Sequence, residues 1–380
     1  MISLVSIRRG AGALKNRLPL LAEIQIDQKR NTSSYDHFMK YGAGGRLSFN
    51  GNVATVFGAT GFLGRYVVNR LAKTGTQIIV PFRGVDEDIR HLRVMGDLGQ
   101  IVFLEYDIRD EEAVARAMSH SNVVINLIGK NHSTRNFSLE DVNVKAVETI
   151  AGAATKQGVD RLVHVSALGA EGRSPSKVFQ LKAQGERVLT DLFPQATIVR
   201  PAECYGHEDD YFNRYAYLRK LPLGVPLVDG GWKTTKRPVY IGDVAQGVVN
   251  ASLDADSKGR TFELYGPEEY YLHDMVEFIF KSIRKPFRSF PVPAIAYSVA
   301  GFLGEQSIFS PRLTRDQAIR QFLTDEVADD SYTFEDLNVT PANMSSTALT
   351  VLRRHRDYYH HDEIMDEEKD YCPPVSTYIS

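Results

Sequence analysis

A glycine-rich turn after a short β-branched run constrains the fold of this chain more than any other feature. Val53–Gly64 reads VATVFGATGFLG, so a predicted strand leads into Gly58, Gly61 and Gly64, and a helical pattern follows over Arg65–Lys73. Glycines at this spacing allow a tight turn, bring backbone N–H groups close to a pyrophosphate and let the helix pack on the sheet. The alternative is an ordinary glycine turn, but the flanking strand and helix favour a dinucleotide site. The predicted cradle comprises Gly58, Thr60, Gly61, Phe62, Leu63 and Gly64.

The residue after the second predicted strand indicates which dinucleotide is bound. That strand spans Gln77–Phe82, and Arg83 follows it with no carboxylate before Asp86. An acidic residue at this place would hold the ribose 2′-hydroxyl of NAD, whereas an arginine pairs with a 2′-phosphate. The alternative is a solvated arginine at a strand end. We predict NADP(H) as the cofactor.

From Gly51 onward, predicted strands and helices alternate. This order implies right-handed crossovers and a parallel sheet covered on both faces, and the strands read as the continuous apolar runs of buried parallel strands. We predict an α/β fold, a Rossmann-like doubly wound parallel sheet with a smaller irregular C-terminal part. The predicted strands are Val53–Phe57, Gln77–Phe82, Ile101–Glu105, Val123–Leu127, Arg161–Val165 and Ala196–Val199, and the helices are Arg65–Lys73, Glu111–Met118, Leu139–Gln157 and Lys177–Leu192.

The alternation weakens after about residue 250, where prolines divide the chain into shorter pieces. We therefore assign residues 50–250 to an NADP(H)-binding Rossmann domain, 251–350 to a C-terminal partner-contacting region and 351–380 to a charged tail. The tail carries His355, His360 and His361 beside acids; a solvated tail is the favoured interpretation over a metal site.

Composition excludes several other classes of protein. The net charge of −2 over 380 residues provides no basic field for nucleic acid. Cys204 and Cys372 are too few and too distant for a disulfide framework, and neither has metal-ligand spacing. No apolar run is long enough to cross a bilayer; the apolar stretch Ala294–Gly304 could instead rest against a partner or a membrane surface.

The N-terminus differs from the rest of the chain in its charge. Residues 1–22 contain four basic residues interleaved with apolar ones and no acid before Glu23. This profile is typical of a mitochondrial transit peptide, and the alternative is a basic tail on a cytosolic protein. We predict that residues 1–35 form a transit peptide and leader, which directs the chain to the mitochondrial matrix.

Further candidate ligands follow the later strands. Asp107 and Ile108 come after the third strand at the expected adenine end, although Asp107 could equally cap the next helix. Beyond the fourth, fifth and sixth strands, the carboxyl edge of the sheet is expected to face the cofactor with Ile128, Gly129, Ser166 and Pro201.

The motifs GATGFLG, DIRD, NLIG, HVSALGA, RPAECYG and RPVYIGDVAQGVVNA together resemble the short-chain dehydrogenase/reductase superfamily. More closely, the chain is similar to the atypical branch that occurs as the alpha subcomplex subunit 9 of mitochondrial NADH:ubiquinone oxidoreductase, respiratory complex I. The resemblance runs from about Gly42 to past residue 340 and includes the segment before the first strand and the arginine in PFRG.

One position departs from the superfamily pattern. Active members carry Tyr-x-x-x-Lys on the helix after the fifth strand, in which the tyrosine protonates substrate and the lysine holds the nicotinamide ribose. Here Lys182 matches the lysine, but Val178 stands in the place of the tyrosine and has no proton to donate. The resemblance implies that Lys182 is a cofactor ligand, and that Ser166 is a remnant of the substrate-orienting serine or a strand-end cap. Tyr205 and Tyr211 lie on a different segment and are the alternatives for a displaced acid, of which Tyr205 would be examined first.

Two classes of function follow. The first is a non-catalytic NADP(H)-binding accessory subunit of complex I, whose partners are other complex I subunits and whose C-terminal part contacts them or the inner membrane. The second is an active NADP-dependent reductase or epimerase with an unusual acid. A redox-sensing regulator would be a third class. Val178 and the leader favour the first.

Overall fold

The computed structural model describes residues 49–221, 224–305, 314–328 and 331–356, and the structural statements below refer to these residues. Its largest element is a seven-stranded sheet in which every neighbouring pair is parallel. The strand order is β11-β6-β5-β4-β1-β2-β3, so the direction of winding reverses between β1 and β4. The strands are β1 (Val53–Phe57), β2 (Gln77–Phe82), β3 (Ile101–Glu105), β4 (Val123–Asn126), β5 (Arg161–Val165), β6 (Thr197–Pro201) and β11 (Thr261–Leu264).

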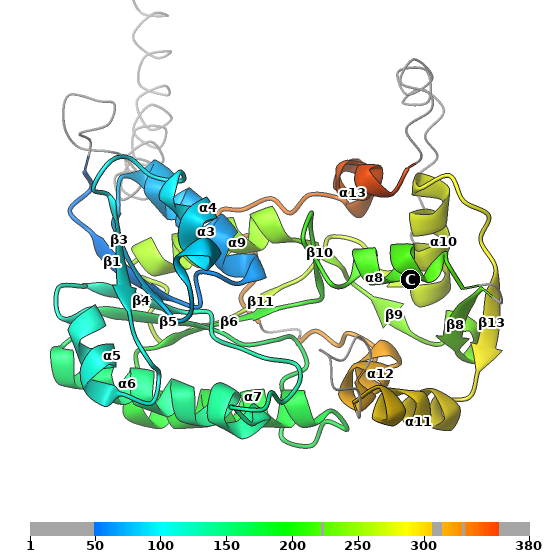
Figure 1. Ribbon diagram of the computed structural model, residues 1–380, viewed down its shortest axis with the longest axis horizontal. Helices are drawn as coiled ribbons and strands as arrows, with labels where there is room; N and C mark the ends of the chain where they lie inside the picture. The colour runs from blue at the N-terminus through cyan, green and yellow to red at the C-terminus, as the bar shows by residue number, and fades with distance from the viewer. Residues whose placement is uncertain (1–48, 222–223, 306–313, 329–330, 357–380) are drawn as a thin grey trace, which may run out of the picture.

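Helices cover both faces of this sheet (Figure 1). One face carries α3 (Phe62–Thr74), α4 (Arg90–Arg93) and α9 (Ile241–Leu253), with α3 packed on α9. The other carries α5 (Glu111–Met118), α6 (Ala146–Gln157) and α7 (Lys177–Leu192), packed in that order. A π-helical turn, η4 (Asp141–Lys145), leads into α6, and a 3₁₀ turn, η3 (Asp86–Ile89), precedes α4. This is the predicted doubly wound α/β architecture.

The C-terminal part contains short strands and helices around its own apolar core (Figure 1). The large side chains Tyr205, Phe212 and Tyr270 are fully buried in it. Three two-stranded pairs join β10 to β7, β12 to β9 and β13 to β8. The strands are β7 (Cys204–Tyr205), β8 (Val225–Val228), β9 (Thr235–Lys236), β10 (Val239–Tyr240), β12 (Tyr270–Tyr271) and β13 (Ser289–Val292). The helices are α8 (Phe212–Leu218), η5 (Asp229–Gly231), α10 (Leu272–Ser282), α11 (Ala294–Glu305), α12 (Arg315–Gln321), α13 (Met344–Leu352) and η6 (Arg353–His355).

The sheet takes its last strand from beyond residue 250, where we expected the Rossmann domain to end. β11 lies between the helices α9 and α10 in sequence but pairs with β6 over Thr261–Leu264. Meanwhile, the chain between β6 and β11 supplies most of the short strands of the C-terminal part. The two parts are therefore interleaved along the sequence.

Two sequence predictions concern segments at the edge of the described structure. The apolar stretch Ala294–Gly304 forms α11, and across the described ranges we find no helix with the length and apolar character that a bilayer crossing requires. The predicted leader, residues 1–35, lies outside the described residues, as does the charged tail from residue 357 onward.

Candidate functional site

The three glycines of the opening motif have different structural roles. Gly58 has φ +78°, and a Cβ there would lie 3.0 Å from the backbone of Leu127, so this turn requires glycine. Gly61 is the residue before α3 and donates its N–H to the Gly58 carbonyl at 3.1 Å. Gly64 lies in the first turn of α3, where a Cβ would be 2.5 Å from the Ala59 backbone. The close packing of α3 on the turn therefore depends on Gly64.

The N-terminus of α3 suits an anion. No side chain caps this helix, and no acidic residue lies in its first turn. The first N–H groups of a helix lack intrahelical acceptors and carry partial positive charge, so they are available to a phosphate. The helix begins at Phe62, directly behind the glycine turn, which places these donors at the switch point between β1 and β4.

One cavity, of about 410 Å³, lies on the β2 and β3 side of this turn. Arg83 extends from the end of β2 into its wall, with Phe137 and Tyr106 nearby. Burial raises the pKa of Tyr106 to about 12, although the charge of Arg83 opposes this shift. Predicted residues that line this cavity are Gly58, Thr60, Gly61, Arg83, Ile108, Ile128 and Gly129.

Asp107 is not among the residues that line this cavity. Its Oδ1 accepts the backbone N–H of Arg109 at 3.0 Å, which forms a local turn. Nor does Asp107 cap the following helix, since Asp110 accepts the N–H groups of Glu112 and Ala113 at the start of α5. The alternative interpretation of Asp107 as a helix cap is therefore wrong, because the cap of α5 is Asp110.

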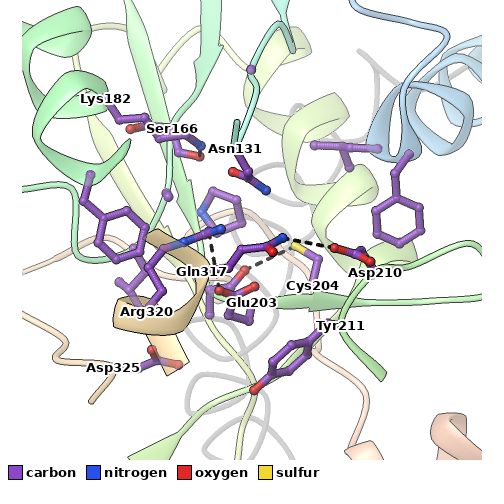
Figure 2. Close-up of a pocket in the computed structure, with 18 of the residues that line it drawn as sticks. Asn131, Ser166, Lys182, Glu203, Cys204, Asp210, Tyr211, Gln317, Arg320 and Asp325 are labelled. Atoms are coloured by element: carbon purple, nitrogen blue, oxygen red, sulfur yellow. Dashed lines mark hydrogen bonds and ion pairs between the residues drawn. The ribbon is translucent and has the colours of Figure 1, made fainter. Parts of the chain in front are cut away.

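A second cavity, of about 310 Å³, lies between the sheet and the C-terminal part (Figure 2). Lys182 on α7 donates from Nζ to the carbonyl oxygen of Ser166 at 2.7 Å. Burial, with the nearby charge of Arg320, lowers the pKa of Lys182 to about 8. Ser166 is only 2% exposed, and within the described structure its Oγ has no hydrogen-bond partner. This buried hydroxyl is therefore available to a ligand or a water in the cavity.

The far wall of the second cavity carries charges that sequence reasoning missed. Arg320 of α12 pairs with Glu203 at 3.7 Å, and Lys236 pairs with Asp325 at 2.8 Å. Burial acts to raise the pKa of Glu203, but the charges of Arg320 and Lys236 outweigh it and hold that pKa below its usual value. Gln317 completes the wall by donating to Asp210 at 3.3 Å. The Thr314–Gln317 capping box marks the start of α12, but no motif places this helix in the cavity wall, because that depends on contacts far apart in the sequence.

Neither Val178 nor Tyr205 is among the residues that line this cavity. Val178 is fully buried, and its neighbour Phe179 faces the cavity instead. Tyr205 lies in the C-terminal core with its hydroxyl 2.6 Å from Oγ1 of Thr347. Our suggestion of Tyr205 as the first displaced acid to examine is therefore wrong. Tyr211 lines the cavity, and burial holds its pKa well above the ordinary value.

Comparisons with known proteins identify the family of this chain. Residues 58–213 match a protein family described as NAD(P)H-binding. The chain is 48% identical to the mitochondrial NADH dehydrogenase [ubiquinone] 1 alpha subcomplex subunit 9 of Mus musculus over 84% of each chain. It is 38% identical to the mitochondrial NADH-ubiquinone oxidoreductase 40 kDa subunit of Neurospora crassa over 86% of each. The chain belongs to the alpha subcomplex subunit 9 family. This assignment rests on similarity over most of both chains.

A solved structure supports the fold alone. The NADPH-dependent quinone oxidoreductase of Escherichia coli, solved with NADPH, superposes with a TM-score of 0.62 at 18% identity, covering 79% of this chain and 99% of that one. The predicted cofactor residues of this family member are divided between the two cavities. Those that line the second cavity are Phe62, Leu63, Ile128, Gly129, Ser166, Lys182 and Pro201. Of the predicted ligands, Gly64 and Asp107 line neither cavity.

Proposed function

We propose that this chain is a non-catalytic, NADP(H)-binding accessory subunit of mitochondrial respiratory complex I. The observation that carries the proposal is that the glycine turn and Lys182 are present, whereas the tyrosine that would act as general acid is replaced by valine. Lys182 lines the second cavity, while the position four residues earlier holds Val178, a fully buried aliphatic side chain. Relatives that share most of this chain bear the names of subunits of the mitochondrial NADH dehydrogenase.

NADP(H) is favoured over NAD(H) by the first cavity. Arg83 lines it directly after β2, where an NAD-binding protein would present a carboxylate to the ribose 2′-hydroxyl. A guanidinium matches a phosphate with two parallel hydrogen bonds. Bound nucleotide would stabilise the fold by mass action, by about 3–4 kcal/mol at a ligand concentration a hundred to a thousand times the dissociation constant.

We place the subunit on the matrix side of the inner membrane, in contact with other subunits through its C-terminal part. The basic, acid-poor leader supports mitochondrial import. Apolar side chains on α11 support contact with a partner or the membrane surface, since Ile295 is 81% exposed and Leu303 is 65% exposed. Residues 251–350 remain the proposed partner-contacting region.

Two measurements test this proposal. The first is native purification of the complex that contains the chain, followed by identification of the nucleotide released on denaturation; we expect NADP(H) in amounts matching the subunit.

The second is calorimetric titration of the full chain with NADPH and with NADH. Replacing Arg83 with Leu should weaken NADPH binding by at least about 1.5–3 kcal/mol, as expected for the loss of hydrogen bonds to a charged group, and leave NADH binding unchanged. Equal affinity of the wild type for both nucleotides would contradict the choice of NADP(H).

One observation favours a second candidate function, an NADP-dependent reductase or epimerase. The cavity beside Lys182 is large enough for a small substrate and has the buried, unpartnered hydroxyl of Ser166 in its wall. Tyr211, rather than Tyr205, would then be the residue to test, because its ring lines the cavity, and its hydroxyl would have to leave Sδ of Met275 to reach a substrate. Turnover of NADPH with a carbonyl panel that disappears in Tyr211→Phe would favour this function.

A further inference from the structure

A second arginine, Arg109, contacts the same aromatic ring as Arg83, that of Phe137 in the lining of the first cavity. The Cζ atom of Arg83 is 4.7 Å from the ring centroid of Phe137, and the Cζ atom of Arg109 is 4.1 Å from the same centroid. Arg109 comes from the loop after β3, whereas Phe137 comes from the loop between β4 and η4. Three separate loops therefore bring two guanidinium groups to one aromatic ring.

The charges of these two arginines are not neutralised. Within the described ranges, no ion pair joins an acid to Arg83 or Arg109, whereas Arg93 nearby is paired with Asp86. The two acids nearest to Arg109 in sequence accept backbone N–H groups: Asp107 that of Arg109 itself, and Asp110 those at the start of α5. Two like charges near one ring repel each other, and a dianion that contacts both guanidinium groups would reduce this repulsion.

Local hydrogen bonds hold the loop that carries the ring of Phe137. Thr134 donates its N–H to the carbonyl of Phe137 at 2.9 Å, and the Phe137 N–H donates to Oγ1 of Thr134 at 3.2 Å. Arg109 also donates from its guanidinium to the carbonyl oxygen of Asn136. A guanidinium has five N–H donors, so most of those of Arg109 remain for another acceptor. Phe137 and Thr134 themselves line the cavity that Arg83 enters.

We propose that Arg109 is a second ligand of the cofactor 2′-phosphate, and that Phe137 is a positioning residue that holds both guanidinium groups ready for it. This inference rests on the proposed binding of NADP(H). It assigns the phosphate to a two-arginine site, in which stacking on Phe137 limits the freedom of two otherwise flexible side chains before the ligand arrives.

The test compares two probes that differ by one phosphate, 2′,5′-ADP and 5′-ADP, in calorimetric titrations of the nucleotide-free full chain. Arg109→Gln should lower the affinity for 2′,5′-ADP about tenfold or more and leave that for 5′-ADP unchanged. The affinity of Arg109→Lys for 2′,5′-ADP should lie between those of the wild type and Arg109→Gln, because lysine keeps the charge but lacks the planar guanidinium. Arg116→Gln removes an exposed arginine from α5 and serves as the charge-matched control.

Phe137→Leu keeps both arginines and removes the stacking surface. We expect it to narrow the preference for 2′,5′-ADP over 5′-ADP, whereas a merely structural loss would weaken both probes equally. Raising the salt concentration should reduce this preference in the wild type more steeply than in Arg109→Gln, since two charges act in the former.

The outcomes separate this inference from the function on which it rests. A wild type that prefers 2′,5′-ADP, with an Arg109→Gln variant that keeps the full preference, would overturn the role of Arg109 and leave NADP(H) binding intact. Equal weakening of both probes in Arg109→Gln would also overturn it. A wild type without any preference for 2′,5′-ADP would overturn the choice of NADP(H) and the two-arginine site together.

Discussion

The Ser176 hydroxyl lies 3.0 Å from both carboxylate oxygens of Asp316, although 140 residues separate the two in the chain. The same carboxylate accepts the backbone N–H of Lys177 at 2.7 Å, so α12 caps the N-terminus of α7. Asp316 also lies 3.4 Å from Arg320, whose guanidinium belongs to the wall of the second cavity. The contact thus joins the C-terminal part to the helix that carries Lys182.

We expect Asp316→Asn to lower the free energy of unfolding by about 1–3 kcal/mol, because several donors at the start of α7 lose a charged acceptor. NADPH affinity should fall as well, since α12 forms part of the cavity wall. Urea denaturation and titration calorimetry measure the two effects. Asp191→Asn, at an exposed site on the same α7, is the control, and equal stability of the two variants would contradict the prediction.

The glycine turn allows cofactor binding to be separated from folding. Gly64→Ala should destabilise even the nucleotide-free chain by about 1–3 kcal/mol, because the new Cβ would lie 2.5 Å from the Ala59 backbone. Gly61 has extended backbone angles (φ −73°, ψ 177°), and a Cβ there meets only the Gly58 carbonyl at 3.2 Å. Gly61→Val should therefore fold without nucleotide but block the approach of the pyrophosphate.

The comparison needs unfolding curves of both glycine variants without nucleotide and titrations with NADPH. Normal assembly of nucleotide-free Gly61→Val into complex I would show that the cofactor is not a structural requirement.

Cofactor affinity should depend on pH through Lys182. Burial lowers the pKa of this ammonium from 10.5 to about 8, so its charge is present below that pH and is lost as the pH rises through it. NADPH affinity should therefore fall as the pH rises through about 8. Lys182→Met should bind NADPH more weakly than the wild type below this pH, and its affinity should show no such fall. Between about 8 and 10.5 the unfolded chain binds more protons than the folded one, so this group makes stability rise with pH there. An unchanged pH profile in Lys182→Met would contradict the assignment.

No hydride transfer from NADPH to carbonyl substrates is expected in the wild type. A general acid contributes about 10²–10⁴-fold, and no hydroxyl occupies position 178. Val178→Tyr should not restore a rate, because the side chain is fully buried and outside the cavity lining; overpacking should instead lower the free energy of unfolding by about 1–3 kcal/mol. The assay is NADPH oxidation by wild type, Val178→Tyr and Lys182→Ala. A wild-type rate that disappears in Lys182→Ala would establish an enzyme.

Strands of the parallel sheet were the most predictable elements. The predicted bounds of β1, β2, β3 and β5 agree with the structure, because each is an apolar run that ends where polar or glycine residues begin, even at the less buried edge strand β3. The cofactor turn was predictable for a similar local reason, since Gly58 needs a positive φ.

Long-range features were not predictable from one sequence. β11 is only four residues long, and its place in the sheet depends on pairing with β6 rather than on any pattern of its own. The residues of α12 read as an ordinary polar helix, and only its docking through Asp316 makes Arg320 part of the site. Arg109 belongs to a motif that we assigned to the adenine end, and its contact with Phe137 depends on a loop conformation with no sequence signature.

The late position of β11 affects synthesis and truncation. The sheet edge at β6 emerges from the ribosome about sixty residues before the strand that covers it, since β6 ends at Pro201 and β11 begins at Thr261. An uncovered edge strand is a template for pairing with other chains. A chain that stops near residue 250 should therefore self-associate through β6 rather than yield a smaller nucleotide-binding domain, and folding in the cell should require protection of this edge until residue 264 has been made.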